Sequence, residues 1–196
     1  MTIPNPHLVA VIDKYVESDL VAMGELIATR RETFPAGANL SVLLPLTPAE
    51  VFVRTFERGA GLTASCGSGM AAARAVYSRI GQADPECDVL IRNAGGTAAA
   101  SLRVRDGRWF PVLEGNATFV YRADVDLVAL TRAQPVRARE PVRAREPGDA
   151  NGPGDAREPY PDEIRAYAAL DEQNVARLHA AGVQTAALET AALETP

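Results

Sequence analysis

The segment from Val53 to Ile80, VRTFERGAGLTASCGSGMAAARAVYSRI, most constrains what this chain can fold into. Residues 51–56 alternate between two faces in the manner of a strand, and the glycine-containing stretch 57–61 interrupts the alternation as a loop does. A helix of small residues is predicted from about residue 69 to Ile80, with Gly81 suited to the position after its end. Cys66 therefore lies at or just before the N-terminus of a helix.

The position of Cys66 at a helix start favours a reactive thiol. Free backbone N–H groups and the positive end of the helix dipole stabilise negative charge, which favours a thiolate. The glycines beside Cys66 leave room for a substrate carboxylate to reach the same N–H groups. A lone cysteine near a helix is often only a small buried hydrophobe. The Gly67-Ser68-Gly69 sequence at the helix start favours the functional interpretation over that one.

The composition narrows the class of protein. The 196 residues suffice for one ordinary domain and a tail, and the net charge of −5 argues against nucleic acid or a membrane surface as partner. No apolar run reaches the roughly 18 residues of a membrane span, and residues 1–13 lack the features of a signal peptide. Two cysteines, Cys66 and Cys87, suit a reducing cytoplasm, where we expect the protein. The one lysine, Lys14, has no site-like setting, which argues against a pyridoxal phosphate Schiff base.

The hydrophobic pattern predicts an α/β (α+β) fold. The helix at 69–80 is apolar nearly all round, so it should be buried, and its short side chains let strands approach closely. We expect a strongly curved, mostly antiparallel sheet wrapped around this central helix, with Arg74, Tyr77 and Arg79 on its open side or end. A second helix should run from Ser18 or Asp19, as cap, to about Arg31. The predicted strands are 7–13, 39–45, 50–57, 87–92, 98–105, 108–113 and 118–125, with a turn at Asp106-Gly107.

The second half of the chain has another character. We divide the chain into a domain at 1–128, a disordered linker at 129–160, a helix at 161–182 and a low-complexity tail at 183–196. PVRARE occurs twice between 135 and 146, and TAALE twice between 185 and 194. We assign no function to residues 130–196 and expect His179 to face solvent. Cys87 would open a strand without a glycine-rich anion site, so we interpret it as structural.

Several motifs in sequence order resemble the diaminopimelate epimerases. NPHLVAV at 5–11, FPAGANLSVL at 34–43, ERGAG and CGSG in the central segment, and the late Asp-Gly hairpin carry the resemblance, over about 3–125. The resemblance covers only the second half of such an enzyme. It implies one of two similar halves, each a curved sheet around a central helix, with substrate bound in the cleft between them and one active-site cysteine from each half.

The resemblance also implies a reaction without cofactor or metal. One cysteine, as thiolate, removes the α-proton of diaminopimelate and the other, as thiol, delivers a proton to the opposite face. LL- and meso-2,6-diaminopimelate are thereby interconverted in lysine and peptidoglycan precursor biosynthesis. Cys66 corresponds to the second-half cysteine, and Glu57 would tune its ionisation. His7 is similar to the histidine that assists the other cysteine, which this chain lacks.

The substrate-binding residues follow from the same resemblance. Asn5, Asn39 and the Glu57-Arg58 pair resemble those at the far end of the substrate, while Gly67 and Ser68 would bind the near carboxylate through backbone N–H groups. The sequence departs from the family at Pro4, where glycine is usual, and at Leu62, where glutamate is common. Neither change removes a group that the mechanism uses.

The missing half leaves three hypotheses open. In the first, the chain is the second half of an isomerase, either from a truncated gene or a start assigned too late, or as a polypeptide that works with a separate first half. We expect it to be inactive alone, and a homodimer is a further option. Alternatively, it is a degenerate amino-acid-binding or interaction protein with the same fold. A third option is a racemase of another amino acid, similar to the proline racemases, against which Asn39 and Glu57-Arg58 argue.

Overall fold

The computed structural model describes residues 5–117 and 161–184. The described residues up to Asn116 and from Leu170 onward belong to one compact unit. The predicted strand at 118–125, the linker at 129–160 and the tail from residue 185 lie outside the described residues, so the division of the chain at residue 128 stays a prediction.

A mixed sheet forms the framework of this unit. Its strands run in the order β1-β2-β3-β5-β6-β7, and the short β4 pairs with β3. β1–β2 and β3–β5 are parallel and the other pairs are antiparallel, which confirms a mostly antiparallel sheet. The strands are β1 (His7–Val11), β2 (Asn39–Thr47), β3 (Glu50–Glu57), β4 (Gly61–Leu62), β5 (Val89–Asn93), β6 (Gly96–Arg105) and β7 (Arg108–Gly115).

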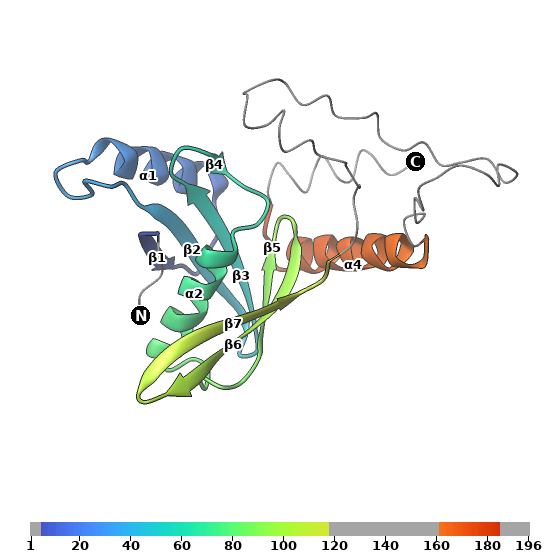
Figure 1. The fold of residues 1–196 in the computed structure, drawn as a ribbon. Helices are drawn as coiled ribbons and strands as arrows, with labels where there is room; N and C mark the ends of the chain where they lie inside the picture. The colour runs from blue at the N-terminus through green and yellow to red at the C-terminus, as the bar shows by residue number, and fades with distance from the viewer. Residues whose placement is uncertain (1–4, 118–160, 185–196) are drawn as a thin grey trace, which may run out of the picture. The chain divides into compact units, whose positions relative to one another are not determined.

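The sheet bends around α2 (Gly67–Arg79), which confirms the predicted central helix. α2 contacts β1, β2, β3, β6 and β7, and Figure 1 shows it inside the curl of the sheet. The helix ends as predicted. Gly81 has φ +77°, and the N–H groups of Gly81 and Gln82 donate to the carbonyls of Ser78 and Tyr77 at 3.0 and 3.1 Å. This pair of bonds is the Schellman motif, in which glycine avoids the strain of a left-handed conformation.

The central strands are buried on both faces because a helix covers each side. Val51 and Val53 pack with α2 in one apolar cluster, while Phe52, between them in sequence, packs in a second cluster on the other face. This is the alternation that the sequence predicted for 51–56. The second cluster includes Leu20 and Ile27 of α1 (Glu17–Thr29).

α1 begins differently from the prediction. Val16 occupies the N-cap position without a side-chain cap bond, and Ser18 and Asp19 lie within the first turn, so neither is the cap. The helix ends at Thr29, with Arg30 as its C-cap, close to the predicted end at about Arg31. Glu17 and Asp19 place acidic groups in the first turn, where the helix dipole favours them without any capping side chain.

The expectation that Arg74 and Tyr77 face the open side of α2 is wrong. They are 0% and 1% exposed, and of the three residues only Arg79 is exposed. The Arg74 guanidinium fits inside because its N–H groups are satisfied there. Its Nη1 donates to Ser78 Oγ, and its other nitrogens donate to the carbonyls of Ala100, Asp84, Pro85 and Cys87, at 2.9, 2.7, 3.1 and 2.7 Å.

Cys87 does not open a strand, since β5 begins at Val89. Its thiol is free and its side chain is exposed, whereas its carbonyl is one of the acceptors of Arg74. The contribution of this residue to the structure is therefore made by its backbone.

The predicted helix at 161–182 corresponds to α4 (Pro161–Ala180). Leu178 and Val183 are fully buried in the same cluster as Phe52. Arg177 and Arg92 both pair with Glu50, and Asn174 donates to the carbonyl of Asn93 at 3.0 Å. Burial alone would raise the pKa of Glu50, but the two arginines outweigh it and hold that pKa below its usual value. His179 is exposed, as predicted.

We expect Leu178→Ala to lower the free energy of unfolding by about 2–4 kcal/mol, because it leaves a cavity in a filled cluster. Urea denaturation of the whole chain measures this. Leu170→Ala on the same helix is the matched control, since that side chain is 44% exposed and its loss should cost no more than about 0.5 kcal/mol. Equal effects of the two changes would show that α4 does not contribute to the core.

Candidate functional site

Cys66 is the N-cap residue of α2, as its sequence position predicted. Its backbone is extended, with φ −132° and ψ 102°, and its side chain makes no capping bond to the helix. The first N–H groups of a helix have no carbonyl partner within it, so those of Gly67, Ser68 and Gly69 point outward beside the sulfur. No acidic residue lies in this first turn, so nothing there offsets the positive end of the helix.

Ser68 joins Cys66 to two other predicted site residues. Its Oγ lies 3.6 Å from Cys66 Sγ, 3.0 Å from His7 Nε2 and 3.1 Å from Asn5 Nδ2, which donates to it. β1 presents His7, and α2 presents Ser68, so residues about 60 positions apart in sequence meet at one hydroxyl. The sequence predicted a role for the backbone of Ser68 but missed that of its side chain.

Glu57 and Arg58 act on His7 from the end of β3. Burial lowers the pKa of His7, the charge of Glu57 opposes that effect, and the charge of Arg58 adds to it. His7 therefore favours the neutral imidazole. Thr63 Oγ1 donates to Glu57 Oε1 at 2.6 Å, which fixes the carboxylate.

Asn39 and Arg58 form a second connected pair. Asn39 is 3% exposed, and its Oδ1 accepts from the Arg58 backbone N–H at 3.0 Å. Arg58 Nη1 donates to the carbonyl of Ala36. His7 and Asn39 are direct partners in the β1–β2 register, which brings this pair to the edge of the Ser68 cluster. The Nδ2 group of Asn39 is a donor, so it is the group of this side chain that could bind an anion.

Two buried hydroxyls lie beneath the helix start, and the sequence interpretation missed both. Ser41 and Thr55 hydrogen-bond to each other at 2.9 Å, and both are nearly inaccessible. A Cβ on Gly69 would lie 2.5 Å from Thr55 Oγ1, 2.9 Å from Ser41 Oγ and 3.3 Å from Cys66 Sγ. The signal was present in the sequence: small hydroxyl residues stand at inward-facing strand positions where an apolar side chain is the norm.

Gly69→Ala should therefore destabilise the chain by about 1–3 kcal/mol, since the Thr55 and Ser41 hydroxyls must move. Gly67→Ala is the matched control. Its Cβ would meet only Leu113, at 3.8 Å, so stability should stay level or rise by up to about 1 kcal/mol from better helix propensity. Thermal or urea unfolding compares the two, and equal stabilities would show that the helix start tolerates a side chain at both positions.

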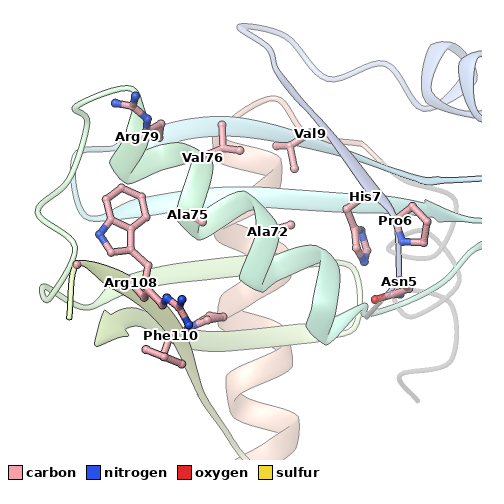
Figure 2. Close-up of a pocket in the computed structure, with 13 residues that line it drawn as sticks. Asn5, Pro6, His7, Val9, Ala72, Ala75, Val76, Arg79, Arg108 and Phe110 are labelled. Atoms are coloured by element: carbon pink, nitrogen blue, oxygen red, sulfur yellow. The ribbon is translucent and has the colours of Figure 1, made fainter. Parts of the chain in front are cut away.

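An open groove of about 1220 Å³ runs along α2. Figure 2 shows Asn5 and His7 at one end, Ala72, Ala75 and Val76 along the helix, and Arg108 and Phe110 of β7 on the other side. Asn5 and His7 are the only predicted site residues that line it, and Cys66 does not. We therefore locate the candidate chemistry at the helix N-terminus and not in the groove as a whole.

Two observations bear on metals and membranes. Within residues 5–117 and 161–184, no three His, Cys, Asp or Glu side chains are grouped so that they could hold a metal ion. None of the helices in the same residues is long and apolar enough to cross a membrane.

The comparisons with known proteins first define a class, because similar sequences are named as epimerases, that is, isomerases. A relative from Lactiplantibacillus plantarum is 36% identical over 126 residues, covering 61% of this chain and 38% of the relative. One from Ligilactobacillus salivarius is 34% identical over 136 residues, covering 64% and 40%. Both are named diaminopimelate epimerase.

The family model for diaminopimelate epimerase matches residues 1–120, and the chain belongs to this family. The resemblance drawn from the sequence motifs is thus confirmed. The chain spans about two fifths of the length of the curated relatives it matches. A solved structure of a predicted epimerase from Pseudomonas aeruginosa is 17% identical, covers 60% of this chain and 40% of that one, and superposes with a TM-score of 0.46.

Proposed function

We propose that this chain is the second half of a diaminopimelate epimerase and supplies one of its two cysteines. Cys66 exchanges a proton with the α-carbon of diaminopimelate, and no cofactor takes part. The reaction interconverts the LL and meso isomers for lysine and peptidoglycan precursor synthesis. The observation that supports this most is the thiol of Cys66 at an uncapped helix N-terminus, connected through Ser68 to Asn5 and His7.

The reaction needs a group that takes a proton from a carbon acid. A thiolate beside free helix N–H groups is suited to this, because the same positive end that stabilises the sulfur also attracts the substrate carboxylate. The N–H groups of Gly67 and Ser68 would bind that near carboxylate. The negative charge that develops next to it as the proton leaves would then form beside donors already in place.

The far end of the substrate carries an ammonium and a second carboxylate. Arg58 and the Nδ2 group of Asn39 are suited to the carboxylate, and Glu57 to the ammonium. Glu57 would also tune the ionisation of Cys66, as the family resemblance implies. Asn5 completes this set. These roles rest on the family motifs and on the hydrogen bond that joins Asn39 to Arg58.

Inversion of a stereocentre by two thiols needs a second thiol on the opposite face of the carbon. The only other cysteine is Cys87, which lies before β5, beyond the C-terminal end of α2, and is exposed. We therefore propose that a separate first half supplies the other cysteine and that His7 assists that group.

Solvent-deuterium exchange into LL-diaminopimelate, followed by mass spectrometry, tests the proposal. The chain alone should show no exchange, and the chain mixed with the first half of a relative should exchange and epimerise. Exchange at a normal rate by the chain alone would contradict the need for a second thiol. Calorimetric binding of diaminopimelate without exchange in the mixture would favour a binding protein that has lost catalysis.

A further inference from the structure

We infer that Ser68 aims its single hydroxyl hydrogen at Cys66 Sγ, because Asn5 and His7 occupy both of its acceptor positions. Ser68 is then a positioning residue that stabilises the thiolate. This inference deepens the proposed function, on which its catalytic consequence rests, but the hydrogen-bond arrangement can be tested on this chain alone.

A serine hydroxyl has one hydrogen to donate and two lone pairs with which to accept. The Nδ2 group of Asn5 can only donate, so it takes one lone pair, at 3.1 Å. One lone pair and the hydrogen remain for the two other neighbours, His7 Nε2 at 3.0 Å and Cys66 Sγ at 3.6 Å. One of these must donate and the other must accept.

The other ring nitrogen of His7 decides between the two arrangements. Nδ1 is buried and has no hydrogen-bond partner in the described part of the chain. A proton on Nδ1 would be a buried N–H without a partner, whereas a proton on Nε2 has an acceptor, Ser68 Oγ, at 3.0 Å. The neutral ring, which burial of His7 favours, therefore carries its proton on Nε2. His7 then donates to Ser68 and takes the second lone pair.

The hydrogen of Ser68 is left for the sulfur. A thiolate accepts this bond directly, whereas the protonated thiol is a weaker acceptor. The hydroxyl thus adds a side-chain donor to the free backbone N–H groups of the helix start, and both favour the charged sulfur. In the proposed reaction, the sulfur holds its charge until the substrate proton arrives.

The test uses the whole chain with Cys87→Ser, which leaves Cys66 as its one cysteine. The ultraviolet absorbance of the thiolate is measured at a mildly alkaline pH, where an ordinary thiol is partly ionised. Ser68→Ala should lower the thiolate-to-thiol ratio by roughly three- to tenfold, the size of one lost hydrogen bond. Ser68→Thr keeps the hydroxyl and should keep the ratio, provided that circular dichroism shows both variants folded.

An unchanged ratio in folded Ser68→Ala, or an equal fall in Ser68→Thr, would overturn the inference. Nitrogen NMR of His7 in the parent chain gives a measurement without any change at Ser68: we expect the proton on Nε2, and a proton on Nδ1 would overturn the assignment. Neither readout needs the first half. If the thiolate-to-thiol ratio and the NMR of His7 both give the expected result, but the mixture with a first half shows no deuterium exchange, the proposed function fails and this inference stands.

Discussion

Cys66→Ala should abolish deuterium exchange into diaminopimelate in the mixture with a first half, by roughly a thousandfold or more. The sulfur is the proposed base, and alanine has no group that accepts a proton. Ser68 Oγ, 3.6 Å from Sγ, cannot replace it because a hydroxyl is far less acidic than a thiol at neutral pH. The measurement is the initial rate of deuterium incorporation at the α-carbon.

Cys87→Ala is the matched control for this variant. That thiol is free like Cys66 but is exposed and belongs to no candidate site, so the exchange rate should stay within about twofold. Cys66→Ser tests the chemistry more closely, since it keeps the shape of the side chain and should still lose the rate. Exchange that persists in Cys66→Ala would remove the base from the proposed mechanism.

Arg74→Leu should lower the free energy of unfolding by about 4 kcal/mol or more. The change removes the hydrogen bonds of the fully buried Arg74 guanidinium to Ser78 and to the carbonyls of Ala100, Asp84, Pro85 and Cys87, and a hydrogen bond of a charged group contributes about 1.5–3 kcal/mol. A domain is commonly stable by only about 5–15 kcal/mol, so a large share of the protein would unfold. Urea denaturation followed by circular dichroism measures the loss.

Arg79→Leu provides the comparison on the same helix. Arg79 is exposed, so its replacement should change stability by no more than about 0.5 kcal/mol. The loss of unfolding free energy in Arg74→Lys should lie between those of Arg74→Leu and Arg79→Leu, because a single ammonium cannot reach acceptors in several directions as a guanidinium does. A loss below about 1 kcal/mol in Arg74→Leu would mean that water satisfies the carbonyls instead.

Local features of the fold could be predicted from the sequence because they depend on neighbouring residues. The alternation at 51–56, the helix that follows Cys66 and the glycine after its end are of this kind. The turn at Asp106-Gly107 is another, and both residues have positive φ, 50° and 69°, as a tight hairpin requires. The curved sheet around α2 could be predicted from one further observation, the small residues on nearly every side of that helix.

Features that depend on distant residues could not be predicted. Nothing in the pattern of α2 shows that carbonyls from 84–87 and from Ala100 would surround Arg74. Likewise, the meeting of Asn5, His7 and Cys66 at Ser68 depends on the pairing of β1 with β2 across the sheet. Cys66 and the glycine-flanked helix start could be predicted from sequence position and chemistry. The other candidate site residues came from the family motifs, and the roles of all of them in binding and catalysis stay predictions.

β1 has a consequence for how the proposed activity would respond to warming. It is a five-residue strand whose described pairing is with β2 alone, and its residues are half-buried or exposed. Short strands at a sheet margin fray at a lower free-energy cost than the rest of a domain. Each fraying event would carry His7 away from Ser68, together with Asn5 just ahead of the strand. In the mixture with a first half, the proposed deuterium exchange should then be lost on heating before global melting, while most of the secondary structure of the chain is still intact.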